Sequence, residues 1–267
     1  MTADREALAE IDRLPGRHLY FLDDHIFGHT PFASALFEGM AGMGRLWQGA
    51  ATVQSILKTD LPERAARAGL RSLFVGFETL SPGNLRDHSK LQNLDRDYTQ
   101  AVNKLHDLGV MINASFVFGM DEDGPDVFER TVEWAIRHGI ETSTFHILTP
   151  YPGTALYERM AAQGRLHHHN WDLYDTRHTV FRPARMTEEQ LTNGYWAAYR
   201  DFYGWSSIAR AAWSKPKLLG KIRHLAYSAG WKKFEPLWDL IIRARQTNRT
   251  LPLLEAILSG LGGIQPR

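Results

Sequence analysis

Carboxylate and imidazole side chains stand at the ends of several short apolar segments of this sequence. Asp23 and Asp24 follow the first segment, Glu78 ends the third, Glu122 follows the fourth and His146 lies in the fifth. Groups of this kind transfer protons or bind the polar part of a ligand. A carboxylate that ends an apolar segment is costly to bury without a partner. We therefore expect Glu78 to face a ligand, with a structural ion pair as the alternative.

The acids of these segments could also have simpler roles. Asp123 and Asp126 could cap the helix that follows them, because carboxylates stabilise the first turn of a helix. Asp24, Glu78 and Glu122 could also be the acid–base groups of an ordinary lyase that needs no metal cluster. The catalytic residues are therefore left unassigned.

The sequence contains no cysteine. This excludes disulfides, thiolate zinc sites, cysteine nucleophiles and cysteine-held iron–sulfur clusters from the chain itself. Three consecutive histidines occupy 167–169, but adjacent side chains point apart on either a strand or a helix. We therefore expect a solvated loop there and no metal site.

The elements that must position these groups alternate between strands and helices. β-rich apolar segments predict five strands, and segments with apolar residues at helical spacing separate them. The predicted strands cover 18–23, 45–50, 72–78, 111–119 and 142–150, and the predicted helices cover 31–40, 60–69, 96–109 and 124–139. Three of the helices close on Gly69, Gly109 and Gly139, which are expected C-caps.

This alternation predicts an α/β fold with parallel strands, since parallel neighbours need a helical crossover. A partial (β/α) TIM-like barrel fits the spacing, and an open doubly wound sheet fits almost as well. The alternation stops near residue 150. We therefore expect the partial barrel in 1–155 and a mostly helical C-terminal extension in 156–267, in which Thr187 and Gln190 form a capping box.

The composition is that of a globular protein, with 43% hydrophobic and 23% charged residues and a net charge of +1. So small a net charge gives no reason to expect a nucleic acid partner. The N-terminal segment lacks an apolar core, and no apolar run is long enough to span a membrane. We expect a cytoplasmic protein.

Two segments of the extension have unusual side chains. Residues 202–234 carry seven lysines and arginines and no acid, interleaved with tryptophan and tyrosine. This pattern suits contact with an anionic membrane surface, but we prefer a helical subdomain whose aromatic residues pack on the barrel. Residues 170–181 are rich in polar and aromatic side chains, and they could form a lid over the mouth of the barrel.

Four motifs in order resemble the later strands of radical S-adenosylmethionine (radical SAM) proteins of the type that usually carries a cobalamin-binding domain. They are FLDDHIFG, RSLFVGFETLSP, SFVFGMDED and HILTPYPGT, and the resemblance covers about residues 15–205. Each motif alone is weak, and the set is specific. The resemblance implies radical chemistry with S-adenosylmethionine on a small organic or lipid-like substrate.

The resemblance also implies a set of cofactor-binding positions. The strand with Gly76 and Glu78 would face the methionine and ribose end of S-adenosylmethionine, with Asp23 and Asp24 near the same end. The family pattern Gly-x-Ile-x-Gly-x-x-Glu, which supports the adenine, matches Ser115, Val117, Gly119 and Glu122, with Ser115 in place of the first glycine. His146, in the last motif, completes the set.

One departure from the family decides what this chain could do alone. Family members hold a [4Fe-4S] cluster with a Cys-x-x-x-Cys-x-x-Cys loop after their first strand. The first strand predicted here matches the family's second, so the cluster loop, the first strand and the cobalamin domain are expected to be missing. The chain would then be a truncated or split enzyme, with a separate polypeptide to supply the cluster loop, or a catalytically dead homologue that serves as a binding or interaction module.

The expected truncation has a physical consequence. A barrel without its first strand exposes the edge of the next one, HLYFLD, whose backbone groups and apolar side chains can pair with another chain. We therefore expect the isolated chain to self-associate.

Overall fold

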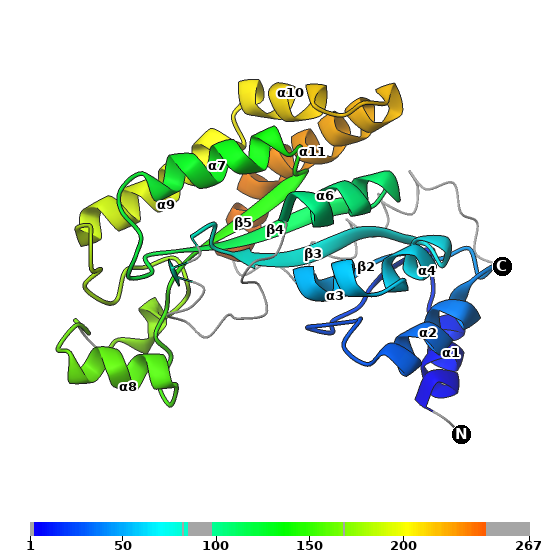
Figure 1. The fold of residues 1–267 in the computed structure, drawn as a ribbon, viewed down its shortest axis with the longest axis horizontal. Coiled ribbons are helices and arrows are strands. Elements are labelled where there is room, and N and C mark those ends of the chain that lie inside the picture. Colours follow the sequence, from blue (N-terminus) through cyan, green and yellow to red (C-terminus); the bar gives the residue numbers. More distant parts are fainter. Residues whose placement is uncertain (1–2, 82, 85–97, 168, 244–267) are drawn as a thin grey trace.

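Five parallel strands form one curved sheet in the order β1-β2-β3-β4-β5 (Figure 1). This computed structural model describes residues 3–81, 83–84, 98–167 and 169–243, with side chains in the last helix described up to residue 232. The strands are β1 (His18–Tyr20), β2 (Leu46–Thr52), β3 (Leu70–Glu78), β4 (Met111–Phe118) and β5 (Thr142–Ile147). The predicted α/β class, a partial (β/α) barrel followed by helices, is confirmed.

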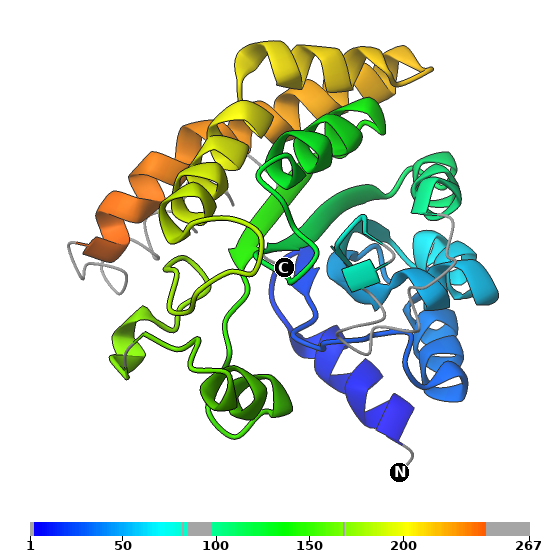
Figure 2. The same cartoon turned by 60° about the vertical axis from the view of Figure 1, so that its left-hand side comes forward.

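The helices lie on the outside of the sheet (Figure 2). Those within the barrel portion are α1 (Ala3–Arg13), α2 (Thr30–Met40), α3 (Val53–Lys58), α4 (Leu61–Arg67), α6 (Tyr98–Asp107) and α7 (Val127–Arg137). The C-terminal part contains α8 (Ala155–Ala162), the short 3-10 helix η2 (Trp171–Leu173), α9 (Glu188–Phe202), α10 (Trp205–Trp213) and α11 (Leu218–Arg243). The boundary at residue 155 coincides with the start of α8, and the division into two domains stays a prediction.

Aromatic side chains fill the layer between the sheet and the helices. Phe77, Phe116 and Phe145 come from three neighbouring strands and stack with ring centroids 5.7 and 6.1 Å apart. Trp134 of α7 meets Phe77 edge-on at 5.3 Å. Successive strand residues point to opposite faces, so the neighbours of these rings along the strands face the other side of the sheet. That face carries the candidate site.

The helix ends follow the sequence prediction. Gly69, Gly109 and Gly139 have φ values of 103°, 72° and 67°, in the left-handed region that glycine adopts without strain. The capping box is also present, because the Thr187 side chain accepts from the Gln190 amide and the Gln190 side chain accepts from the Thr187 amide. These caps fix where the crossover helices stop and the strands begin.

The outer edge of β5 is covered by tyrosine hydroxyls from α9 and from its C-cap residue, Tyr203. Tyr203 donates to the Ser143 carbonyl at 2.9 Å and accepts from the Ser143 amide at 3.1 Å. Tyr199, one helical turn earlier, makes the same pair of hydrogen bonds with Phe145, at 3.2 and 3.1 Å. Further along, the Ile147 amide donates to the Thr176 carbonyl at 2.7 Å. We call this the closed edge.

The outer edge of β1 is different. Among the described residues no strand pairs with it, since β1 is the terminal strand of the sheet and bonds only to β2. Tyr20 and the nearby Leu22 expose 59% and 89% of their surfaces. We call this the open edge. The self-association expected from it stays a prediction.

The C-terminal helices pack back onto the barrel portion, with α9 against α7 and β5 and with α11 against α10 and β5. Within the described part of the chain, no helix has the length and apolar character needed to cross a membrane. Residues 244–267 of the predicted helical extension lie outside the described residues.

Candidate functional site

A row of small side chains crosses the sheet near the carboxyl ends of the strands, on the face opposite the helices. Thr52 of β2 pairs with Gly76 of β3, Gly76 with Ser115 of β4, and Ser115 with Thr144 of β5. Because no member of this row is larger than threonine, this face of the sheet carries three hydroxyl groups and one position without a side chain. Such a surface can accept a flat or extended ligand.

Glu78 lies directly beyond this row because the strand bulges. Gly76 pairs with Ser115 while Glu78 pairs with Phe116, so one extra residue is inserted in β3. Glu78 adopts a φ of 64°, a left-handed backbone conformation that residues other than glycine and asparagine rarely adopt. A Cβ atom on Gly76 would lie 3.1 Å from Glu78 Oε1. The bulge therefore directs the Glu78 carboxylate back over Gly76. Because glycine has no side chain, the carboxylate has space at this position.

His146 continues the site on the neighbouring strands, where it pairs with Val117. Its Nδ1 lies 3.2 Å from Thr176 Oγ1. Burial lowers the pKa of His146; the charge of Glu78 opposes this shift, and that of Arg177 adds to it. The imidazole is therefore neutral at neutral pH and can donate or accept one hydrogen bond beside the Glu78 carboxylate.

The segment 170–181 reaches this end of the sheet. Its Thr176 has a φ of 68°, a strained conformation for a β-branched residue, and its carbonyl caps β5. Val180 and Phe181 are fully buried. The segment therefore forms a fixed wall next to His146 in this structure, and its function as a lid stays a prediction. Thr176 and Arg177 were not found from the sequence, since neither lies on a strand.

Gly119 allows the close approach of a neighbouring helix, and its amide takes part in the turn after β4. Its φ is 94°, and a Cβ atom there would come within 2.8 Å of a Leu191 methyl group. The amides of Gly119 and Met120 donate to Asp123 Oδ2 at 2.9 and 3.0 Å, and Asn84 donates to Oδ1 at 2.6 Å. Burial raises the pKa of Asp123 to about 6 despite these donors. Asp123 therefore holds the turn after β4 together.

Glu122 lies on the rim of the molecule. Its carboxylate pairs with Arg185 at 2.6 Å, and its amide donates to Asn84 Oδ1 at 2.8 Å. Its assignment to the cofactor site stays a prediction. Asp126, at the N-cap of α7, makes no side-chain capping bond and pairs with Arg130.

The two acids after β1 are exposed. Asp23 accepts from the His25 amide at 2.8 Å and thereby shapes the turn. His25 Nε2 in turn lies 3.5 Å from Thr52 Oγ1, at the start of the row of small side chains. Asp24 is exposed and lies in the same turn. The turn thus reaches the site through His25.

The described residues contain no group of three or more histidines, aspartates or glutamates that could hold a metal ion. Of the three consecutive histidines, His167 pairs with Glu188 at 2.8 Å and His169 lies 3.3 Å from the Tyr157 hydroxyl. His168 lies outside the described residues.

Comparison with known sequences finds methyltransferases. The chain is 33% identical over 196 residues to the bacteriochlorophyllide d C-12(1)-methyltransferase of Chlorobaculum tepidum, which covers 73% of this chain and 42% of that protein. It is 25% identical over 156 residues to the hopanoid C-2 methylase of Rhodopseudomonas palustris, covering 56% of this chain and 30% of that protein. The chain thus spans less than half the length of these curated relatives. No family model matches it.

Comparison with solved structures finds the same fold. The radical S-adenosylmethionine methyltransferase TsrM from Kitasatospora setae superposes with a TM-score of 0.50 at 14% identity, over 60% of this chain and 33% of that one. At this identity the likeness concerns the fold. The four motifs begin on or directly after β1, β3, β4 and β5. Together these relationships show that the chain belongs to the radical SAM superfamily.

Proposed function

We propose that this chain binds S-adenosylmethionine on the sheet face opposite the helices and forms part of an enzyme for radical chemistry on a small organic or lipid-like substrate. The observation that carries the proposal is the row Thr52, Gly76, Ser115 and Thr144 with the Glu78 carboxylate folded over its glycine. S-adenosylmethionine has a flat adenine, a ribose and a charged amino acid end, and a bare sheet face beside a carboxylate suits such a molecule.

Different residues near the row would contact different parts of the ligand. Glu78 would accept from the ammonium group of the methionine part, because a carboxylate at a strained, bulged position is a preorganised acceptor. Ser115 and Thr144 would offer hydroxyls to the ribose. Val117 would lie under the adenine, and the neutral His146 would bound the site toward Thr176. When bound, S-adenosylmethionine supplies a sulfonium whose carbon–sulfur bonds can be broken.

Residues Gly119, Glu122, Asp23 and Asp24 would act less directly. Gly119 supports the turn after β4, and Glu122 is already paired with Arg185. The turn with Asp23 and Asp24 reaches Thr52 through His25. These four positions are therefore proposed to shape the site from its edge.

The residues of this chain do not fit a [4Fe-4S] cluster, because none of its 267 residues is cysteine. No step is assigned to an iron centre held by this chain. We propose that a separate polypeptide with a Cys-x-x-x-Cys-x-x-Cys segment supplies the cluster and adds a strand to the open edge at Tyr20 and Leu22. Support comes from the outer edge of β1, which pairs with no strand among the described residues and is a template for β-strand addition.

Calorimetric titration with S-adenosylmethionine tests the binding proposal. Glu78→Gln removes one charge-assisted hydrogen bond and is expected to weaken binding by roughly tenfold to a hundredfold. Gly76→Val places a side chain in the row and should have at least as large an effect. Glu189→Gln, at an exposed position on α9, is the matched control. A folded wild-type chain that gives no binding signal would overturn the proposal.

A second candidate is a binding or interaction module without catalysis, favoured by the absence of cysteine together with the open edge. The two candidates differ once S-adenosylmethionine binding is established. Co-purification of a cysteine-bearing partner followed by cleavage of S-adenosylmethionine supports the enzyme. Binding with no cleavage in the presence of such a partner supports the module.

We also propose that the segment 202–234 contacts an anionic membrane surface. Support comes from the exposure of Trp205, Trp213, Leu218 and Ile222 next to lysine and arginine, which differs from the packed helical subdomain preferred from the sequence. Sedimentation with phosphatidylglycerol vesicles tests this contact. The other side of α10 packs against α7 and α11, where Ile208, Ala211 and Ala212 are buried.

A further inference from the structure

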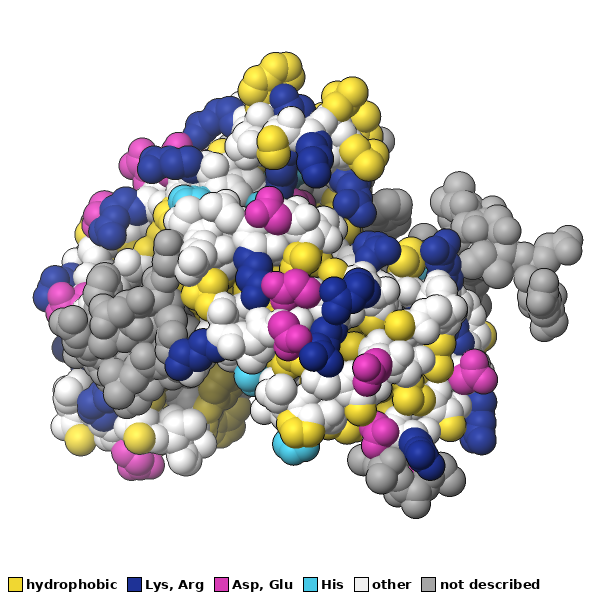
Figure 3. All heavy atoms as spheres, turned by 45° about the vertical axis from the view of Figure 1, so that its right-hand side comes forward, with side chains coloured by type: hydrophobic (Ala, Val, Ile, Leu, Met, Phe, Trp, Pro, Cys, Tyr) yellow, Lys and Arg dark blue, Asp and Glu magenta, His cyan; other side chains and the backbone are white. Residues whose placement is uncertain are grey.

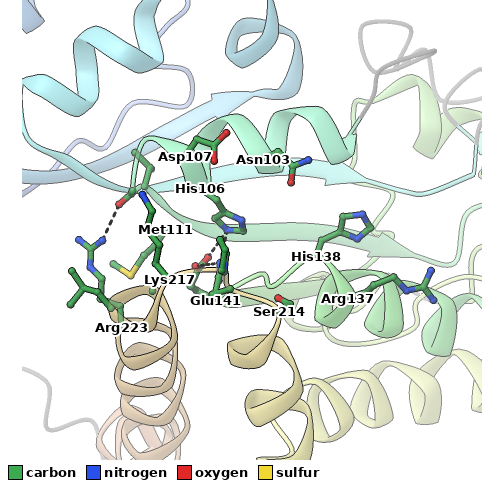
Figure 4. Close-up of a pocket in the computed structure, with 16 residues that line it drawn as sticks. Asn103, His106, Asp107, Met111, Arg137, His138, Glu141, Ser214, Lys217 and Arg223 are labelled. Atoms are coloured by element: carbon green, nitrogen blue, oxygen red, sulfur yellow. Dashed lines mark hydrogen bonds and ion pairs between the residues drawn. The ribbon is translucent and has the colours of Figure 1, made fainter.

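A cavity of about 620 Å³ lies at the amino ends of β4 and β5, at the opposite end of these strands from Glu78. Figure 4 shows that its walls come from the ends of α6 and α7 and from the corner between α10 and α11. The proposed S-adenosylmethionine site uses none of these residues. The cavity is therefore a separate feature that needs its own explanation.

The inner wall of the cavity is a buried ion pair. Lys215 Nζ lies 2.5 Å from Glu141 Oε1 and 2.8 Å from His106 Nε2. Burial raises the pKa of Glu141, but His106 and Lys215 more than offset this and hold it at about 2. Burial lowers the pKa of Lys215, and the charge of Glu141 opposes that shift. The pair fixes the α10–α11 corner to the start of β5 and adds no net charge to the cavity.

The rim gives the cavity its positive charge. Four cationic side chains line the cavity and two acidic ones, Asp107 and Glu141, oppose them. Arg137 has a partner in Glu133 at 4.0 Å. Lys217 and Arg223 form no ion pair with any residue in the described ranges, and Arg223 donates only to the Gly109 carbonyl at 3.4 Å. These two cations can therefore receive an external anion.

An apolar surface adjoins the rim on the same helix. Leu218, Leu219 and Ile222 lie within one turn of α11 and expose 72%, 69% and 55% of their surfaces, and Trp213 at the end of α10 exposes 78%. Leu219 also lines the cavity. Figure 3 shows hydrophobic side chains beside lysine and arginine at the top of the molecule, over α10 and α11. So many large apolar side chains at one corner mark an interaction site.

We propose that this corner docks on an anionic bilayer and that the cavity receives a phosphate head group of one lipid. The inference deepens the membrane contact proposed above. Apolar side chains of an interfacial helix enter the bilayer by about 5–10 Å, which places neighbouring cations at the level of the phosphates. Lys217, directly before α11, and Arg223, on α11, flank Leu218, Leu219 and Ile222 in this way.

The combination of charge and apolar surface selects a bilayer over other anions. A nucleic acid would use the cations and leave the exposed leucines and Trp213 in water. An anionic bilayer offers phosphates for Lys217 and Arg223 and acyl chains for the apolar side chains. Lys221, 4.2 Å from the centre of the Trp213 ring, holds that ring beside the cationic rim, as is common at membrane interfaces.

Vesicle co-sedimentation of the full chain tests the proposal. Wild type is expected to bind phosphatidylcholine vesicles that contain phosphatidylglycerol more tightly than phosphatidylcholine alone. The double variant Lys217→Ala with Arg223→Ala is expected to lose about tenfold or more of this affinity, since each basic side chain near the surface contributes about 1 kcal/mol. Arg200→Ala, an exposed arginine on α9, is the matched control and should bind as wild type does.

Three results would each overturn one part of the proposal, and they distinguish the head-group site from the membrane contact. If wild type does not bind vesicles that contain phosphatidylglycerol, the proposed membrane contact is wrong. If wild type and the double variant bind equally, the contact stands and the head-group site fails. If Leu219→Ser with Ile222→Ser converts a dimer to a monomer in sedimentation velocity, the apolar surface is an interface between two copies.

A soluble probe completes the test. Inorganic phosphate without vesicles is expected to leave the thermal unfolding midpoint unchanged, because the apolar contacts are then missing. A rise in the midpoint that the double variant abolishes would assign the cavity to a free anion in place of a lipid. Circular dichroism checks the fold of every variant, which is expected to be retained because the substituted side chains are exposed.

Discussion

The two edge strands of the sheet differ in what bonds their outward-facing amides and carbonyls. At the closed edge, the hydroxyls of Tyr199 and Tyr203 bond both the amides and the carbonyls of β5. At the open edge, the described residues offer β1 no strand partner, and Leu22 is almost fully exposed. A sheet edge invites pairing unless something covers it. The difference teaches that, within the described residues, the C-terminal helices complete the sheet at its β5 edge.

Removal of the buried cation behind the closed edge should have the largest effect. Lys215→Met leaves the buried Glu141 carboxylate without its lysine partner and with His106 at 3.3 Å, which is expected to lower the free energy of unfolding by about 3 kcal/mol. Urea denaturation measures the loss. Lys217→Met, at a neighbouring cation without an ion pair among the described residues, should change stability by less than about 0.5 kcal/mol. Similar small losses in both variants would show that the ion pair does not hold the closed edge.

Acid should weaken the closed edge through His224 of α11. Burial lowers the pKa of this imidazole to about 4 from a usual value of 6.5. Between these values the unfolded chain binds a proton that the folded chain does not, so stability present above pH 6.5 is lost as the pH falls through 4. The full loss is about 3 kcal/mol.

His224→Leu is expected to flatten this part of the stability profile, measured by urea denaturation at a series of pH values. His18→Gln, which removes an exposed imidazole on β1 at the open edge, is the matched control. A slope that survives His224→Leu would place the titrating group elsewhere.

Loss of a single tyrosine hydroxyl should cost less. Tyr203→Phe leaves the buried amide and carbonyl of Ser143 without partners, which is expected to lower the free energy of unfolding by about 2 kcal/mol. Tyr199→Phe should cost about half as much, since Tyr199 is half-buried and water can replace its hydroxyl. Tyr157→Phe at an exposed hydroxyl is the control. Equal stability of all three variants would mean that water covers β5 as well as tyrosine does.

Charges at the open edge should change association and leave stability nearly unaltered. Tyr20→Lys with Leu22→Lys is expected to shift the chain toward monomer in light scattering, because lysine on an edge strand opposes pairing. Its free energy of unfolding should change by less than about 0.5 kcal/mol. Leu14→Lys, exposed at the end of α1, is the control for added charge alone. A wild-type chain that stays monomeric at high concentration would remove the basis of this prediction.

The sequence predicted those parts of the fold that local patterns determine. The strands, the crossover helices, the glycine caps and the capping box at Thr187 depend on apolar periodicity and on a few residue types near each helix end. Gly76, Glu78, Ser115 and His146 also came together, because parallel strands bring their carboxyl ends to one edge of the sheet.

Features that depend on contacts between distant segments could not be read in the same way. The bulge at Glu78 arises from pairing with β4, and no residue type in the sequence predicts it. The Arg185 that pairs with Glu122 lies 63 positions away in the sequence. Thr176 caps β5 from a segment whose composition indicated a possible lid and no particular contact with this strand. Each of these needs the three-dimensional arrangement of two segments that are far apart in the chain.

The tyrosine hydrogen bonds of β5 also determine how this part of the molecule should open over time. The amides of Ser143 and Phe145 are bonded to side chains of one helix, whereas amides inside the sheet are bonded to a neighbouring strand. A brief departure of α9 would expose both amides to solvent while the pairing of β4 with β5 persists. Their hydrogen exchange should therefore follow a single rate, set by the local unfolding of α9.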